Sequence, residues 1–178
     1  MKIWLVLFSV LVTVAQAEVT EIALGWQTSC ALLTGGAIKC WGSNNEGQLG
    51  DGTTTTRNTP VDVSGITTAT SIAFGSLHSC AVLTGGTVKC WGYNSRGQLG
   101  DGTTTDRTIP VEVSGITTAT SIALGYYHSC AVLTGGSMKC WGENDFGRLG
   151  DGTIADRTTP VEVSSITTPT SIAVGEHT

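Results

Sequence analysis

The strongest constraint on this chain is an internal repeat, because a block of 50 residues is written three times. The second and third copies, residues 75–124 and 125–174, agree at about 36 of 50 positions. Repeats of this length are typical of propellers and solenoids, in which one unit cannot bury its own apolar face and packs on its neighbours. The sequence therefore predicts copies at about 25–74, 75–124 and 125–174, with the start of a fourth at 171–178.

The amino-terminal residues indicate the compartment. Lys2 precedes an apolar run over residues 3–14, and Ala15 and Ala17 form a small-x-small cleavage pattern. The run is shorter than the ~20 residues that a membrane-spanning helix needs, and the pattern is that of a secretory signal peptide. We expect residues 1–17 to be a signal peptide and the protein to be secreted, cell-surface or periplasmic.

The remaining chain, residues 18–178, should form the repeat region with no further membrane span. The full sequence has 24 glycines, only 13% charged residues and a net charge of −5 without a basic run. A nucleic-acid binder normally carries a basic patch, so we expect no nucleic-acid partner. Many glycines and threonines favour short strands and tight turns over helices. The expected class is all-β.

Each copy reads as four short antiparallel strands. In the middle copy, the Gly85–Gly86 pair marks a tight turn, because glycine reaches positive φ without a steric penalty. A glycine-studded connection follows over residues 92–103, and Gly115 lies in the turn toward the next copy. The expected strands are residues 78–83, 87–91, 110–113 and 120–124.

Two cysteines recur in every copy, ten residues apart. Pairing Leu83 with Thr87 across the Gly–Gly turn places Cys80 opposite Cys90, at a separation that a disulfide bridges. Zinc prefers closely spaced ligands such as C-x-x-C, which the sequence lacks, and free thiols are the remaining alternative. The expected bridges are Cys30–Cys40, Cys80–Cys90 and Cys130–Cys140.

The copies differ mainly in two loops. In an up-and-down order of strands, the connections at 75–78 and 92–103 lie at one end of the repeat, and the Gly–Gly turns lie at the other. The copy-specific residues fall in loops of the first end. Two explanations account for these differences. One is sequence drift at exposed positions. The other is a recognition face on a rigid scaffold, where exposed aromatic residues suit binding hot spots. The candidate contact residues are Trp26, Gln27, Ser76, Leu77, Tyr93, Arg96, Tyr126, Tyr127, Glu143 and Phe146.

The segment from Cys90 to Thr103 contains Trp-Gly, then Asn, then Gly-Gln-Leu-Gly-Asp-Gly-Thr. This pattern resembles the signature of the RCC1 (regulator of chromosome condensation) repeat family. Matching blocks begin at Trp41 and Trp141. The resemblance implies a β-propeller, usually seven-bladed, with four-stranded blades, so that three copies and a stub would be an incomplete part of a ring. WD-type repeats are shorter and carry Trp-Asp, and kelch repeats do not account for the Leu-Gly-Asp-Gly-Thr block.

The resemblance implies two different kinds of function. The founding member of the family is a nuclear guanine-nucleotide exchange factor that docks on chromatin, whereas a secreted bacterial member inhibits β-lactamase through loops at one propeller face. The expected signal peptide, disulfides and acidic balance argue against the first. We expect a secreted, non-catalytic module that binds an unidentified protein. The alternatives are a repeat region attached to an enzyme whose catalytic domain lies outside this chain, and a structural or adhesive surface module.

No residue pattern in the chain indicates catalysis or a cofactor. His78 and His128 recur at a strand start, where a histidine is expected to make hydrogen bonds within the propeller. An aspartate follows each Leu-Gly pair, but calcium loops need several alternating oxygen ligands, and Asp-Gly suits a turn. We expect no enzyme activity, no cofactor and no metal. If the chain is really this short, bare faces on the outermost blades also predict marginal stability or self-association.

Overall fold

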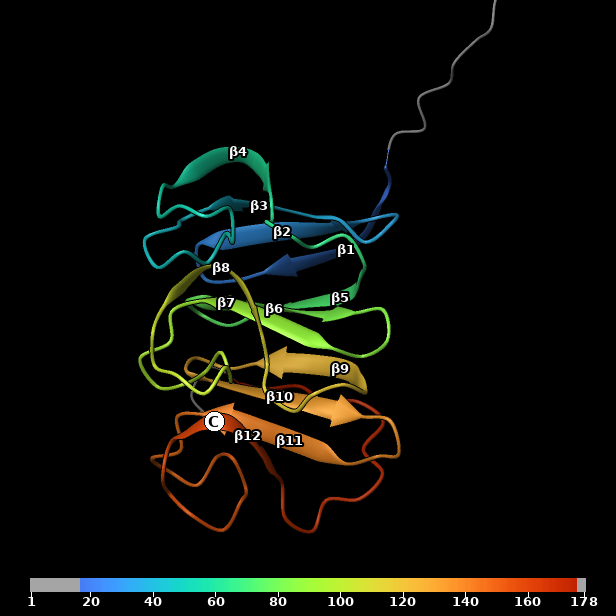
Figure 1. Ribbon diagram of the computed structural model, residues 1–178, viewed down its shortest axis with the longest axis vertical. Helices are drawn as coiled ribbons and strands as arrows, with labels where there is room; N and C mark the ends of the chain where they lie inside the picture. The colour runs from blue at the N-terminus through green and yellow to red at the C-terminus, as the bar shows by residue number, and fades with distance from the viewer. Residues whose placement is uncertain (1–16, 176–178) are drawn as a thin grey trace, which may run out of the picture.

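The computed structural model describes residues 17–175 (Figure 1). Within this range there are twelve strands in three four-stranded sheets and no helix. The expected signal peptide lies outside the described range except for Ala17, as do the last three residues of the expected fourth copy. None of the described residues form a helix that is long and apolar enough to cross a membrane.

The three sheets are the blades of a β-propeller. Each blade takes three strands from one copy of the repeat and its first strand from the six residues before that copy, so the expected strand at 120–124 belongs to the third sheet and not to the second. Every sheet is an antiparallel meander in chain order, as the sequence predicts. Blade 1 consists of β1 (Val19–Leu24), β2 (Thr28–Leu33), β3 (Ile38–Gly42) and β4 (Arg57–Asp62). Blade 2 consists of β5 (Ala69–Phe74), β6 (His78–Leu83), β7 (Val88–Gly92) and β8 (Arg107–Glu112). Blade 3 consists of β9 (Ala119–Leu124), β10 (His128–Leu133), β11 (Met138–Gly142) and β12 (Arg157–Glu162).

The expected register of the cysteine-bearing hairpins is confirmed. Cys80 is opposite Cys90 on the antiparallel pair β6–β7, and the other two copies pair in the same way. All three within-copy disulfides are present, with 4.1 Å between the Cα atoms of each pair. The outer strand β8 begins at Arg107, three residues earlier than expected, because Arg107 pairs with Gly92 across a bulge.

The Gly–Gly turn needs glycine for two separate reasons. Gly85 and Gly86 both have positive φ, at 92° and 87°, where other residues are strained. A Cβ on Gly86 would also lie 2.7 Å from the Cα of Thr118, in the connection to the next blade. This close approach lets the Ala119 amide donate to the Gly86 carbonyl at 2.8 Å. The turn therefore joins one blade to the first strand of the next.

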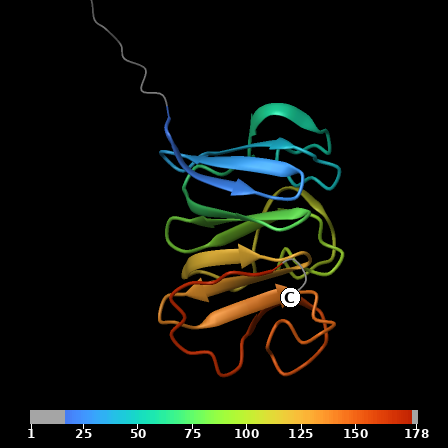
Figure 2. The same cartoon turned by 180° about the vertical axis from the view of Figure 1, so that it is seen from behind.

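The three blades stack one on another, as Figure 2 shows, and the apolar core lies between them. The Cys80–Cys90 disulfide packs with Val113 and Ile116 against Ile122 and Trp141 of blade 3. A second cluster joins blade 1 to blade 2 in the same way. Each blade therefore has a back face, with the disulfide, that packs on the front face of the next blade, with the tryptophan.

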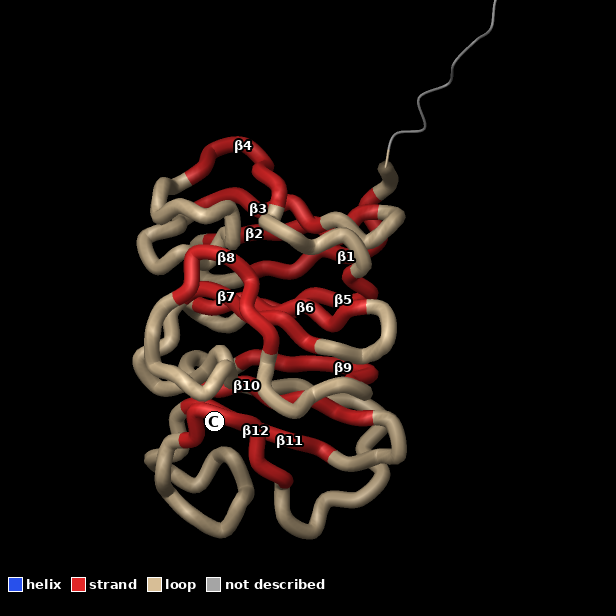
Figure 3. Tube along the Cα trace, in the orientation of Figure 1, coloured by secondary structure: helices blue, strands red, loops and turns tan. Residues whose placement is uncertain are grey.

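The connections gather at two rims, as the meander order requires. The loop rim carries residues 25–27, 43–56 and their equivalents in the other copies, whereas the turn rim carries the Gly–Gly turns and the links between blades. In Figure 3 the long loops lie on the left and the short turns on the right. The copy-specific loops share the loop rim, in agreement with the expectation from the sequence.

Candidate functional site

The long loops of the loop rim are organised from within by a buried asparagine. In the middle copy, Asn94 is completely buried, and its Nδ2 donates to the carbonyls of Thr103 and Thr105, both at 3.1 Å. Its Oδ1 accepts from the Leu99 amide at 2.9 Å. Asn44 and Asn144 make the same contacts in the other copies. One side chain thus ties together both ends of each loop.

The recurring aspartate has a structural role in the same loop. Asp101 Oδ1 accepts from the amide and hydroxyl of Thr103 at 2.9 and 2.7 Å, and Oδ2 accepts from Arg107 Nη2 at 2.7 Å. Burial alone would raise the pKa of Asp101, but the bonds from Thr103 and Arg107 outweigh it and lower the pKa. The pKa of Asp151 falls to about 2, chiefly through the Thr153 hydroxyl. The ion pairs Arg57–Asp51 and Arg157–Asp151 repeat this arrangement in the other copies.

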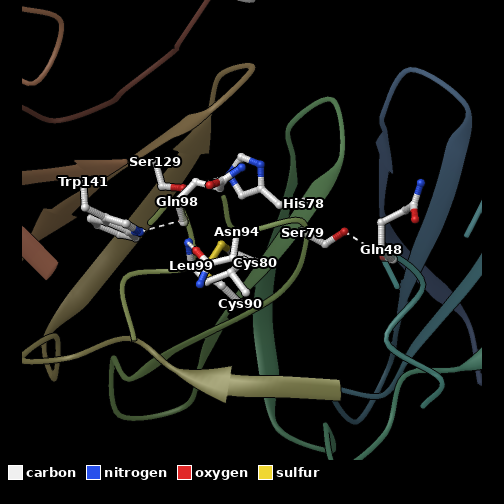
Figure 4. Close-up of a disulfide and its surroundings, with 10 residues drawn as sticks. All are labelled: Gln48, His78, Ser79, Cys80, Cys90, Asn94, Gln98, Leu99, Ser129 and Trp141. Carbon is white, nitrogen blue, oxygen red and sulfur yellow. Dashed lines mark hydrogen bonds between the residues drawn. A yellow bond between two sulfur atoms is a disulfide. The ribbon is translucent and has the colours of Figure 1, made fainter. Parts of the chain in front are cut away.

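Adjacent blades are joined by hydrogen bonds that the sequence analysis missed. Trp91 Nε1 and Ser79 Oγ, on the front face of blade 2, both donate to the Gln48 carbonyl of blade 1 at 2.9 Å. Trp141 and Ser129 donate to the Gln98 carbonyl in the same way, at 2.8 and 2.9 Å (Figure 4). Because the acceptor is a backbone carbonyl 31 to 43 residues away, no side-chain pattern reveals it.

His78 connects blades 2 and 3. Its Nε2 lies 2.9 Å from Ser129 Oγ, and the Ser129 hydroxyl donates its proton to the Gln98 carbonyl (Figure 4). His78 Nε2 must therefore be the donor, so its Nδ1 is the unprotonated nitrogen. Burial lowers the pKa of His78 to about 3, with a smaller contribution from the nearby His128. The histidine and serine are completely buried and bridge two blades, which confirms a hydrogen-bonding role within the propeller.

Three of the candidate contact residues form an aromatic cluster on the loop rim. The ring centroids of Tyr93 and Tyr127 are 5.8 Å apart, and those of Tyr126 and Tyr127 are 4.3 Å apart with edge-to-face geometry. Burial and the bond to Tyr126 raise the pKa of Tyr127 to about 12, so its hydroxyl stays protonated. The cluster is half-buried and spans blades 2 and 3.

Charged candidate residues border this cluster. Arg96 lies 3.2 Å from Asp156 and 3.8 Å from Glu143, both in the corresponding loop of blade 3. Glu143 is only 8% exposed and also forms an ion pair with Arg148. Arg148 in turn lies over the ring of Phe146, which is 86% exposed. Asp156 and Arg148 were not expected in the site, although both are positions where the copies differ.

Trp26 and Ser76 follow the first strands of blades 1 and 2, at the inner edges of the blades. They line a pocket of about 260 Å³ with Leu24, Phe74 and the ends of the other innermost strands. Trp26 is 67% exposed. The rim therefore has two candidate regions: this axial pocket and the tyrosine cluster.

Gln27 and Leu77 tie neighbouring loops together through their backbones. The Gln27 carbonyl accepts from the Ser43 amide at 2.8 Å, and the Leu77 carbonyl accepts from the Tyr93 amide at 3.0 Å. Among residues 17–175, no group of three or more His, Cys, Asp or Glu side chains is placed to hold a metal ion.

Four-stranded meander blades with a tryptophan on one face, a disulfide on the other and an asparagine-centred loop define a repeat β-propeller. The profile for the regulator of chromosome condensation (RCC1) repeat matches residues 36–82, 85–132 and 136–178, and a second profile of that name matches residues 19–48, 69–98 and 119–148. The chain belongs to the RCC1 repeat family. A search of curated proteins by sequence finds no match.

Solved structures share this fold. Human WBSCR16 is 26% identical with a TM-score of 0.80, and the match covers 91% of this chain and 44% of that protein. Prp20p from Saccharomyces cerevisiae, described with its binding properties to Gsp1p and histones, is 22% identical with a TM-score of 0.79, covering 92% and 43%. Yeast RCC1 (Prp20) bound to Kap60 is 21% identical with a TM-score of 0.77, covering 92% and 41%. The chain thus spans less than half the length of these proteins.

Proposed function

We propose that this chain is a secreted, non-catalytic module that binds another protein through the loop rim. The observation that carries the proposal is the grouping of copy-specific side chains on that rim, over loops held rigid by a buried asparagine and aspartate. Binding residues concentrate on such loops when a rigid scaffold positions them. The proteins of similar fold that are described with Gsp1p, histones or Kap60 also bind other proteins.

The chemistry of the rim suits a protein partner. Tyr126, Tyr127 and Trp26 offer aromatic surface, which dominates binding hot spots. Arg96, bound to Asp156 and Glu143, offers a charged border to the tyrosine cluster. The expected contact residues remain Trp26, Gln27, Ser76, Leu77, Tyr93, Arg96, Tyr126, Tyr127, Glu143 and Phe146.

Three disulfides support the secreted part of the proposal, because disulfides persist in oxidising compartments. The amino-terminal pattern with Ala15 and Ala17 supports cleavage after residue 17. Mass spectrometry of the protein exported by a secretory host tests this directly. A mature chain beginning at Glu18 is the expected result, and a retained amino terminus would contradict it.

Capture experiments test the binding surface. The immobilised chain is expected to retain a partner from the extracellular medium of its source, and Trp26→Ser together with Phe146→Ser should remove most of that binding. Both side chains are more than half exposed, so the fold should tolerate the change. The matched control is Thr117→Ser with Thr118→Ser on the opposite rim, which should bind as the unchanged protein does. Equal loss in both variants would contradict a loop-rim interface.

A further inference from the structure

Two blade faces have no neighbouring blade within the described residues: the front of blade 1 and the back of blade 3. On the front of blade 1, Ile22 is 56% exposed, whereas its equivalents Ile72 and Ile122 are 4% and 8% exposed. Ile166, on the back of blade 3, is 46% exposed, and its equivalent Ile116 is completely buried. These positions are apolar in every copy, so the faces have the composition of a covered junction.

The two bare faces carry complementary halves of the bonds that join interior blades. Ser29 and Trp41 hold the donor positions on blade 1 whose equivalents in blades 2 and 3 bond to the preceding blade. On blade 3, Arg148 occupies the position of Gln48 and Gln98, whose carbonyls are the acceptors.

The glycine beside the acceptor supports the same complementarity. A Cβ on Gly100 would lie 2.8 Å from Trp141 Nε1 of the next blade, and Gly50 stands in the same relation to Trp91. A Cβ on Gly150 would meet only Val163 of its own blade. The back face of blade 3 therefore has space beside Gly150 for the tryptophan of a following blade. Trp41 is the equivalent tryptophan on the front face of blade 1.

We propose that copies of this chain associate head to tail, with the back face of blade 3 in one copy against the front face of blade 1 in the next. Ser29 Oγ and Trp41 Nε1 of the second copy donate to the Arg148 carbonyl of the first. A second copy is the occupant favoured by the structure, because the chain itself carries both complementary halves. Such a contact is heterologous, so it forms a ring if the rotation closes and an open chain if it does not.

The segment 169–174 takes part in this association. Ile172 and Val174 pack on the back of blade 3, as Ile122 and Leu124 pack on blade 2, so the segment lies where the first strand of a following blade belongs. Its sequence, Ser-Ile-Ala-Val-Gly at 171–175, parallels Glu-Ile-Ala-Leu-Gly at 21–25. In the associated form it replaces β1 beside β2 of the second copy. This exchange of like strands is a low-cost route to an assembly.

Light scattering after size-exclusion chromatography tests the proposal with the disulfide-bonded chain at several concentrations. The mass is expected to rise above that of one copy as concentration increases. Trp41→Glu and Ile166→Glu each place a charge on one bare face, and each variant alone should remain a monomer. Ile109→Glu is the control, since Ile109 is half exposed on the outer strand β8, and its mass should follow the unchanged chain. A concentration-independent monomer for the unchanged chain would overturn the proposal.

Mixing the two monomeric variants makes the test specific. Each retains one intact face, so an equimolar mixture should form a 1:1 dimer that does not grow further. Failure to pair would exclude a head-to-tail contact, provided that circular dichroism and non-reducing mass spectrometry show both variants folded and bridged. Deletion of residues 169–178 should also abolish association of the otherwise unchanged chain. Association that persists without this segment would overturn the strand exchange.

Discussion

Blades 2 and 3 have closely similar sequences but different surroundings. Within residues 17–175, blade 2 has a neighbouring blade on each face, whereas blade 3 has one on its front face only. Val113 and Ile116 of blade 2 are completely buried, but Val163 is half-buried and Ile166 is 46% exposed. The same apolar side chains thus become core or surface according to whether another blade covers them.

This difference shows where the stability of the array lies. The cysteine-bearing hairpin and the disulfide of a blade form within one copy, but the apolar clusters need residues from two copies. In a repeat protein the interface between neighbours supplies much of the stability. Changes at an interior junction should therefore cost more than the equivalent changes at an end face.

The largest contrast is expected for the tryptophans. Trp141 is completely buried between blades 2 and 3, so Trp141→Ala should lower the free energy of unfolding by about 3–5 kcal/mol. Trp41→Ala removes the equivalent side chain from a bare face and should cost only about 1 kcal/mol. Denaturant unfolding at a concentration where the chain is monomeric measures both. Equal losses would show that the junction contributes little.

Disulfide removal should produce the next largest effect. Replacing Cys80 and Cys90 by alanine relaxes a short loop in the unfolded state, which costs about 2–3 kcal/mol, and also leaves space in the cluster shared with blade 3. Replacing Cys130 and Cys140 should cost less, because fewer neighbours cover that bridge. Thermal unfolding of the two double variants compares them. A larger loss for the blade 3 pair would contradict the ranking.

The buried histidine predicts acid sensitivity at the junction of blades 2 and 3. The pKa of His78 is about 3 in the folded chain and about 6.5 in an unfolded one. Between about pH 6.5 and pH 3 the unfolded state binds a proton that the folded state excludes. The free energy of unfolding therefore decreases as the pH is lowered from 6.5 to about 3, and His78 does not change it above pH 6.5. His78→Gln should remove this dependence of the free energy of unfolding on pH, whose slope is at most about 1.4 kcal/mol per pH unit. Urea unfolding between pH 7 and pH 3 measures the slope.

His128 provides the comparison, because it is the equivalent residue in blade 3. Burial lowers its pKa to about 4, with a smaller effect from the charge of Arg148. His128→Gln should therefore remove the same kind of slope only down to about pH 4, and the two variants should diverge below that. An unchanged pH profile in His78→Gln would mean that the junction opens before His78 is protonated.

The smallest contrast concerns the turn after the outer strand. Gly115 has a φ of 67°, but the third copy has Ser165 at the same place with a φ of 61°. A non-glycine residue in this region is strained by about 1–2 kcal/mol. Ser165→Gly should stabilise the chain by roughly 1 kcal/mol after the entropy of glycine is subtracted, and Gly115→Ser should destabilise it by a similar amount. Melting temperatures that move in the same direction would contradict this account.

Part of the fold was predictable because its causes are local. The Gly85–Gly86 turn and the ten-residue spacing of Cys80 and Cys90 are enough to predict the hairpin register, and the meander order follows from four short strands per copy. The third copy departs at Pro169, which lacks the amide that Ala119 donates to the Gly86 carbonyl. There the Thr168 amide donates to Gly136 instead, with a positive φ of 59°.

The candidate site was predictable only in part. Its location on one rim follows from strand direction, since successive connections of a meander alternate between the two ends. The partners of individual side chains do not follow from strand direction. Glu143, one of the proposed contact residues, forms ion pairs with Arg96 and Arg148 that its place in the sequence does not indicate. Asp156, 60 residues from Arg96 in sequence, becomes its partner only because adjacent blades align their loops.

The sequence by itself determined the repeat, the strands, the disulfides and the rim on which the copies differ, because each depends on residues within about 50 positions. Only the tertiary structure decided which carbonyl accepts a hydrogen bond from each tryptophan, which histidine is buried between blades and which apolar faces remain exposed. These depend on how one blade stacks on another. Stacking places a backbone acceptor in one copy against a side chain of the next, and a backbone carbonyl has no signature in the sequence.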